Sequence, residues 1–384
     1  MDLSPVVDLS DAELRRRGGL KWTLPPADVL PAWVAEADVA PAPEITDAVR
    51  RAVDAGDFGY PVPDDASGLP EALSGYADRQ WAWDVDPGRV VVTADVMSGV
   101  LLALLALCDE APVVVPTPTY PPFLGVVPQS GRELVPVPLE PDAERAALDL
   151  DAVDAALAGG ARTVLLCNPH NPWGRAFSRD ELAALLEVAA ARGARIVSDE
   201  IHAGLVLPGA GHVPLLSLPG AADLVTTVVS ASKAWNLPAL KCAQIVCGTE
   251  ADVRALRELP LVYNHGTSSL GVHAAVAAYT RGGPWLDAWV TRLGENRDLF
   301  TQLVSTELPR ARTRPMEATY LAWLDLRAYG HDDPAAVALE RGRVMVNDGR
   351  DFGPGGAGHV RVNLATSTER VERIVGRLAD AFEG

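Results

Sequence analysis

The chain contains very little lysine. Of its 33 basic residues only three are lysines, at positions 21, 233 and 241, and the others are arginines. An arginine side chain is effectively never deprotonated, so it cannot act as an amine nucleophile. A sequence that otherwise uses arginine but has a lysine within a dense motif therefore indicates that the amine itself is needed there.

Cysteine is scarce as well. The four cysteines lie in apolar, strand-like or helix-like surroundings, and their spacing matches no common metal site: Cys108, Cys167, Cys242 and Cys247. This pattern predicts buried free thiols in a reducing compartment, and no metal centre. We therefore expect a cytoplasmic protein.

Long apolar runs and excess positive charge are also missing. No run approaches the roughly 20 apolar residues that span a bilayer, and residues 1–19 lack the basic start and apolar stretch of a signal peptide. The net charge of −18 makes nucleic acids and anionic membrane surfaces unfavourable partners. We expect neither kind of partner.

The chain does have a large apolar content, with 48% hydrophobic residues among 384. That size favours two interlocked domains over one small domain. Short apolar runs predict strands at 89–93, 111–116, 132–139, 163–167, 195–199, 224–231 and 243–248. Their unbroken Val, Ile and Leu content indicates strands buried on both faces, and intervening helices such as 96–108 and 178–193 favour an α/β fold with a mostly parallel, doubly wound sheet.

The pattern changes after about residue 280. A long amphipathic helix at 285–308 precedes shorter segments, which we predict as strands at 320–326, 344–346 and 359–365 and helices at 334–342 and 368–382. This mixture is typical of a smaller α+β domain. We therefore predict an N-terminal segment (1–45) that joins the small domain, a large domain (46–280) and the small domain itself (281–384).

The sequence SASKAWNLPALK, residues 230–241, directly follows a predicted buried strand. A lysine just past the carboxyl end of such a strand lies where α/β folds bind ligands. The flanking serines and the second lysine suit a phosphate group. Burial and nearby cations can lower the pKa of a lysine until its amine forms a Schiff base.

Two further motifs follow neighbouring strands. NPHNPWG (168–174) is a turn that directs an amide side chain, Asn171, into the cleft. Asp199 ends the strand RIVSD and precedes His202. A carboxylate at that place is unfavourable without a partner, and a protonated pyridine nitrogen would be a suitable one.

Taken in order, NPHNPWG, SDEIH, SASK with a cation eight residues later, and the arginine in HVRVNLA resemble fold-type I pyridoxal 5′-phosphate (PLP) enzymes of aminotransferase class I/II. The resemblance implies that Lys233 forms the Schiff base with PLP and acts as general acid and base. It implies that Asp199 binds the pyridine nitrogen, Asn171 donates to the phenolic oxygen, and Tyr120 stacks on the ring.

The resemblance also implies ligands for the phosphate and the substrate. The phosphate ligands would be the side chains of Ser230 and Lys241 and the backbone N–H groups of Val96 and Met97. Arg361 would pair with the substrate α-carboxylate through its planar, two-pronged donor. Tyr60, in FGYPVP, would reach the phosphate of the neighbouring subunit, which implies a homodimer with shared active sites.

Three positions depart from the family pattern. His202 stands near the phenolic oxygen where many aminotransferases have tyrosine, and Lys241 stands where many have arginine. Asp95, at the phosphate-binding turn, is a carboxylate where related sequences usually have a small residue. We expect the Asp95 side chain to point away from the phosphate.

The N-terminal block around WVAEADV, with FGYPVP and SDEIH, resembles the cystathionine β-lyase/MalY/PatB branch more closely. In that branch Trp33 and its neighbours approach the substrate side chain. The resemblance implies a lyase that cleaves the Cβ–S bond of cystathionine or another cysteine S-conjugate to thiol, pyruvate and ammonia. The alternatives are an aminotransferase of the same fold, a PLP enzyme acting on an S-cysteinyl natural-product intermediate, and a non-catalytic regulatory protein.

Overall fold

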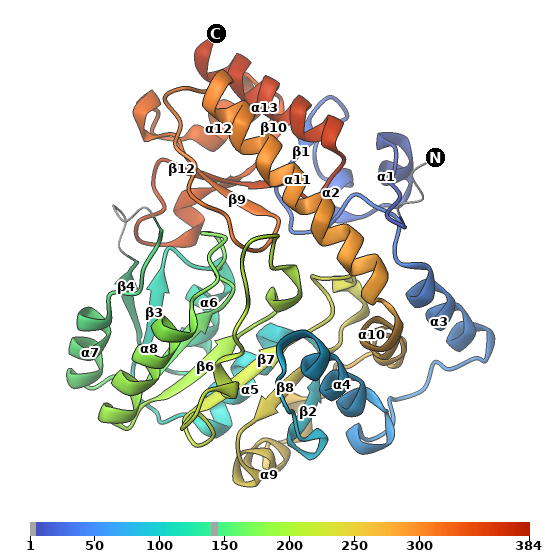
Figure 1. The fold of residues 1–384 in the computed structure, drawn as a ribbon, viewed down its shortest axis with the longest axis vertical. Helices are drawn as coiled ribbons and strands as arrows, with labels where there is room; N and C mark the ends of the chain where they lie inside the picture. The colour runs from blue at the N-terminus through green and yellow to red at the C-terminus, as the bar shows by residue number, and fades with distance from the viewer. Residues whose placement is uncertain (1–4, 140–144) are drawn as a thin grey trace.

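The computed structural model describes residues 5–139 and 145–384, and a seven-stranded sheet lies at its centre (Figure 1). In spatial order its strands are β2 (Val90–Thr93), β8 (Ala243–Cys247), β7 (Val225–Val229), β6 (Arg195–Asp199), β5 (Thr163–Cys167), β3 (Val113–Thr117) and β4 (Leu134–Pro138). All neighbours are parallel except the two pairs that β8 makes with β2 and β7. The predicted α/β fold with a mostly parallel sheet is confirmed.

Both faces of this sheet are covered. The helices α5 (Val96–Leu107), α6 (Pro121–Gln129) and α9 (Glu250–Glu258) pack on one face, and α7 (Leu150–Ala158) and α8 (Arg179–Arg192) pack on the other. On β5, Val164 and Leu166 face the cluster with α7 and α8, whereas Leu165 faces the cluster with α5 and α6. Burial on both sides explains why these strands are rich in Val, Ile and Leu and do not alternate between apolar and polar residues.

A second, antiparallel sheet of three strands lies in the C-terminal part, in the order β11 (Asn347–Asp348), β12 (His359–Asn363) and β9 (Leu321–Asp325). It packs with α11 (Gly283–Glu307), α12 (Pro334–Glu340) and α13 (Thr368–Glu383) around one apolar cluster. The long helix α11 runs from beside α10 (Ser269–Arg281) up to this sheet (Figure 1).

The N-terminal residues attach to the C-terminal part of the chain. After the short helices α1 (Asp11–Arg16) and α2 (Leu20–Thr23), strand β1 (Leu30–Pro31) pairs in parallel with β10 (Val344–Met345). The chain then continues into α3 (Pro43–Asp54) and α4 (Leu69–Trp81), both of which contact α10. The domain bounds at 45 and 280 stay a prediction. No helix in the described parts of the chain combines the length and apolar character needed to cross a membrane.

Candidate active site

The strand directions bring residues from distant parts of the sequence to one edge of the large sheet. Strands β2, β3, β5, β6 and β7 point the same way, so the segments that follow them emerge at the same edge. Because β8 runs in the opposite direction, the residues that precede it reach this edge too. The residues placed there are Asp95, Tyr120, Asn171, Asp199, Lys233 and Lys241.

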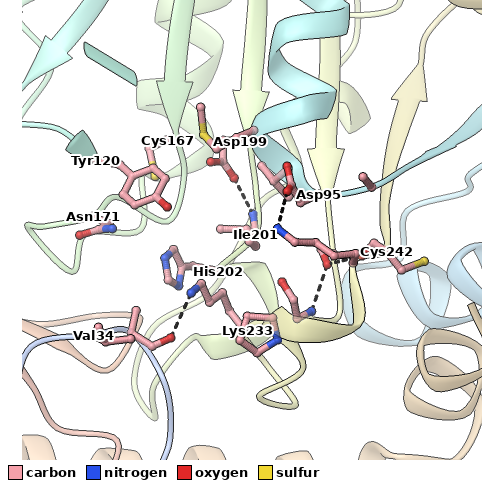
Figure 2. A pocket seen from close by; sticks show the side chains of 18 of the residues that line it. Val34, Asp95, Tyr120, Cys167, Asn171, Asp199, Ile201, His202, Lys233 and Cys242 are labelled. Carbon is pink, nitrogen blue, oxygen red and sulfur yellow. Dashed lines mark hydrogen bonds and ion pairs between the residues drawn. The ribbon is translucent and has the colours of Figure 1, made fainter. Parts of the chain in front are cut away.

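A cavity of about 340 Å³ lies at this edge, between the large sheet and the N- and C-terminal segments. Eleven of the twelve predicted site residues line it: Trp33, Val96, Met97, Tyr120, Asn171, Asp199, His202, Ser230, Lys233, Lys241 and Arg361. Figure 2 shows Tyr120, Asn171, Asp199, His202 and Lys233 grouped around the same space. The structure therefore collects in one place residues that span 329 positions of the sequence, from 33 to 361.

Lys233 follows β7, and its partly buried side chain lines the cavity. The Nζ atom donates a hydrogen bond of 3.0 Å to the backbone oxygen of Ala35. Burial lowers the pKa of Lys233 to about 8, the positive Arg361 acts in the same direction, and Glu36 and Asp199 oppose it. A large share of this amine is therefore neutral near pH 8, which is the form that acts as nucleophile and base.

Asp199 is the last residue of β6 and is only 2% exposed. Its Oδ1 atom accepts a hydrogen bond of 3.0 Å from the backbone N–H of Ile201. Burial raises the pKa of Asp199 to about 7, and the N–H of Ile201 only partly offsets this. A cation placed against the carboxyl group would favour its charged form. The residue therefore suits the protonated nitrogen of a pyridine ring.

Arg361 lies on β12 and is a buried cation. Its guanidinium donates to amide oxygens of Asn171 (3.1 Å) and Asn347 (2.7 Å) and to the backbone oxygen of Trp33 (3.2 Å). No acidic side chain in the described residues forms an ion pair with it, and within the same residues its buried Nε has no hydrogen-bond partner. Burial lowers the pKa of Arg361 to about 10, at which it remains charged. A buried cation without an anion indicates an anion-binding site.

His202 is the second buried side chain in the cavity with an unsatisfied polar atom. Its Nδ1 has no hydrogen-bond partner among the residues that the structure describes. Burial lowers the pKa of His202 to about 3, and the positive charges of Lys233 and Arg361 lower it further. The imidazole is therefore neutral at physiological pH, so one ring nitrogen donates and the other accepts. The unsatisfied atoms of His202 and Arg361 fit a polar ligand such as PLP with its substrate.

The expectation for Asp95 was wrong, because its side chain does not point away from the site. Asp95 precedes α5, and its Oδ1 accepts from the backbone N–H of Ser98 at 2.8 Å as the helix cap. Its Oδ2 lies 2.8 Å from Nζ of Lys241, and both residues line the cavity. Burial raises the pKa of Asp95, but the bonds from Lys241 and Ser98 outweigh this and lower it.

Neither the hydroxyl of Ser230 nor that of Tyr60 is positioned to donate to a phosphate in the cavity as the structure stands. The Ser230 hydroxyl donates to the backbone oxygen of Cys242 at 2.7 Å, so it must leave that oxygen to donate to a phosphate. Tyr60 lies outside the cavity and is 84% exposed, with its ring centroid 5.4 Å from that of His265. Its predicted reach into a neighbouring subunit stays a prediction, as do the roles of the other site residues.

Sequence reasoning missed several residues that line the cavity: Ala35, Cys167, Cys242 and Asn347. Cys167 ends β5 directly before the NPHNPWG turn, and that position was an available signal. Asn347 gave no local signal, because it reaches the site through its pairing with Arg361 across β11 and β12.

Known proteins resemble this chain over nearly its whole length. The family model described as "Aminotransferase class I and II" matches residues 34–378. Cystathionine beta-lyase of Corynebacterium glutamicum is 38% identical over 374 residues, which cover 96% of this chain and 98% of the relative. Cystathionine beta-lyase PatB of Bacillus subtilis is 35% identical over 363 residues, which cover 92% and 93%.

A solved structure gives the same result. A candidate PLP-dependent beta-cystathionase from Corynebacterium diphtheriae superposes with a TM-score of 0.94 at 35% identity, covering 99% of both chains. The chain therefore belongs to the aminotransferase class I and II family, in its cystathionine β-lyase/MalY/PatB branch, which confirms the resemblance seen in its motifs.

Proposed function

We propose that this chain is a PLP-dependent carbon–sulfur β-lyase, which cleaves cystathionine or another cysteine S-conjugate to a thiol, pyruvate and ammonia. One structural observation carries the proposal. The buried Arg361 cation has no acidic partner in the described chain, and it lines the same cavity as the Lys233 amine and the Asp199 carboxyl group. The β-lyase relatives support the choice of reaction within the family.

The cavity has residues suited to each part of PLP. Lys233 would hold its aldehyde carbon, Asp199 its pyridine nitrogen, and Asn171 its phenolic oxygen. Tyr120 would stack on the ring, beside the neutral His202. The phosphate ligands would be the N–H groups of Val96 and Met97 with the side chains of Ser230 and Lys241. When bound, PLP supplies an electron-withdrawing ring that accepts the electron pair left at Cα.

The protein groups bind the substrate and move its proton. The guanidinium of Arg361 would bind the α-carboxylate, already oriented by the amide oxygens of Asn171 and Asn347. The amine of Lys233, with a pKa lowered to about 8, is basic enough to take the Cα proton and acidic enough to return one. Trp33 lines the same cavity and would bound the space for the sulfur substituent.

The lyase is tested by supplying substrate without an amino-group acceptor. The purified protein with PLP is incubated with L-cystathionine and with S-alkyl cysteines, without any oxo acid. We expect pyruvate and free thiol in equal amounts over many turnovers. Turnover that appears only after an oxo acid is added would instead identify an aminotransferase.

We also propose a homodimer with shared sites. Tyr60 is exposed, as are the apolar side chains of Phe58, Val62, Leu261 and Val262 in the neighbouring parts of the chain. A partner subunit would cover these side chains and receive Tyr60 at its phosphate site. Mixing the Tyr60→Phe and Lys233→Ala variants tests this, because a shared site predicts that hybrid dimers regain activity at one site. Two variants that stay inactive together, or a monomer in light scattering, would contradict it.

The predicted cytoplasmic location remains a proposal. All four cysteines are reduced in the structure, and three of them are buried: Cys167, Cys242 and Cys247. Such thiols agree with a reducing compartment. Fractionation of cells that express the tagged chain would test the location.

A further inference from the structure

The inference concerns the ion pair between Asp95 and Lys241. Oδ2 of Asp95, which is labelled in Figure 2, lies 2.8 Å from Nζ of Lys241. Its Oδ1 accepts from the backbone N–H and the hydroxyl of Ser98 at 2.8 and 2.9 Å. One carboxylate thus neutralises the lysine and caps helix α5. It makes the contacts that an anion would make at the start of a helix.

These contacts lie where the proposed function needs a phosphate. The N–H groups of Val96 and Met97 and the amine of Lys241 line the same cavity as Asp95. The other two cations of the cavity, Lys233 and Arg361, have separate tasks in the proposed mechanism. The charges of Lys241 and Asp95 at the start of α5 therefore cancel, although the phosphate to be bound there is an anion.

We propose that Asp95 is a built-in competitor for the cofactor phosphate. Its carboxylate pairs with Lys241 and caps α5 at Ser98, and its charge repels a phosphate at the N–H groups of Val96 and Met97. This inference rests on the proposed PLP-dependent function. As a consequence, PLP would be held mainly through Lys233 and the ring contacts, and its phosphate would be bound weakly. PLP would therefore dissociate and rebind faster than at a site without this carboxylate.

The charge of Asp95 persists at neutral pH. Burial acts to raise the pKa of this carboxyl group, but the bonds from Lys241 and Ser98 lower it below the ordinary value. Both partners of the ion pair are partly exposed, with 53% of the Lys241 side chain and 36% of the Asp95 side chain accessible. Salt therefore screens the repulsion between Asp95 and a phosphate, and its effect on affinity should shrink as ionic strength rises.

The Asp95→Asn variant isolates the charge, because asparagine is an equally good helix cap and keeps the oxygen that accepts from Ser98. Asp86→Asn is a matched control. Asp86 also caps a helical turn, accepting from the N–H of Gly88 at 2.8 Å, and it pairs with Arg89 at 3.6 Å, but it does not line the cavity. Both variants change the net charge by the same amount.

The experiment compares dissociation of PLP and of pyridoxal, which lacks the phosphate, from the full-length loaded protein, followed by the absorbance of the lysine-bound cofactor. We expect Asp95→Asn to bind PLP about tenfold more tightly than the parent at low salt, given the Coulomb energy of charges this close. The gain should fall in high salt. The affinity for pyridoxal, and every affinity of Asp86→Asn, should not change.

Equal or weaker PLP binding by Asp95→Asn would overturn the inference, and it would instead make Asp95 a residue that holds Lys241 in place for the phosphate. A tighter binding of pyridoxal as well would also overturn it, since the effect would then not involve the phosphate. If Asp95→Asn does not fold, Asp95→Ser, which keeps a capping oxygen, replaces it. Failure of the parent protein to bind either compound through Lys233 would refute the proposed function itself.

Discussion

The amine of Lys233 lies 3.0 Å from the backbone oxygen of Ala35, a residue 198 positions earlier in the chain. The hydroxyl of Tyr320 donates to the same oxygen at 3.0 Å. The N-terminal segment is therefore bonded to the site from both sides, by a residue that follows β7 of the large sheet and by a residue that precedes β9 of the small sheet. This oxygen keeps a donor when Lys233 turns to the cofactor.

Lys233→Ala should abolish both covalent retention of PLP and turnover, because the variant lacks the amine that we propose bonds the cofactor and moves the Cα proton. A loss of at least about 10³-fold in kcat is expected. Lys233→Arg is the matched control that keeps the positive charge, and it should be equally inactive because arginine stays protonated. Near-normal activity in either variant would refute the assignment of Lys233.

The rate at which the chain takes up pyridoxal should follow the pKa of Lys233. Because burial lowers this pKa from 10.5 to about 8, half of the amine is neutral at about pH 8, and the neutral form is nearly complete roughly one pH unit higher. The observed rate in stopped-flow absorbance should rise about tenfold per pH unit below pH 8 and level off above it. A rate that continues to rise to about pH 10 would show an unperturbed lysine.

The free energy of unfolding of the cofactor-free protein should depend on pH through the ionisation of Asp199. Its pKa is raised from 3.8 to about 7, so between these values the folded state binds more protons than the unfolded state. The free energy of unfolding therefore gains a contribution that is full below about pH 4 and is lost as the pH rises through about 7.

Urea unfolding of the parent protein and of Asp199→Asn at several pH values measures this contribution. The parent should lose stability relative to the variant, by a few kcal/mol, as the pH rises from about 4 to about 8. A difference that is independent of pH would mean that Asp199 titrates normally.

In turnover, Asp199→Asn should exchange the substrate Cα proton with solvent deuterium far more slowly than the parent protein, whereas Asp199→Glu should retain part of the rate.

Arg361→Lys should weaken substrate recognition while leaving the cofactor in place. Lysine keeps the charge but loses the planar pair of donors, so kcat/KM should fall by about 10²-fold or more. PLP affinity should fall much less than kcat/KM, because Arg361 touches the predicted cofactor ligands only through its hydrogen bond to the side chain of Asn171. Steady-state kinetics and PLP titration on the same preparations check the two parts. An unchanged kcat/KM would show that the α-carboxylate binds elsewhere.

Much of the fold followed from local pattern. The strand β5 and the helix α8 lie within one residue of their predicted bounds, because an unbroken apolar run and a capped amphipathic run are both encoded by neighbouring residues. The direction of β8 was not predicted. Its sequence, AQIVC, is equally suited to a parallel or an antiparallel position, and only its neighbours decide between them.

The sequence by itself determined the strands, the motifs at their ends and the family, since each depends on residues close together in the chain. Only the tertiary structure decided which of these residues meet. Asp95 shows the difference. Its capping of α5 depends only on its position directly before the helix, where its side chain accepts from the N–H of Ser98. Its bond to Lys241, 146 positions away, exists because β8 runs against its neighbours and brings that lysine back to the same edge of the sheet.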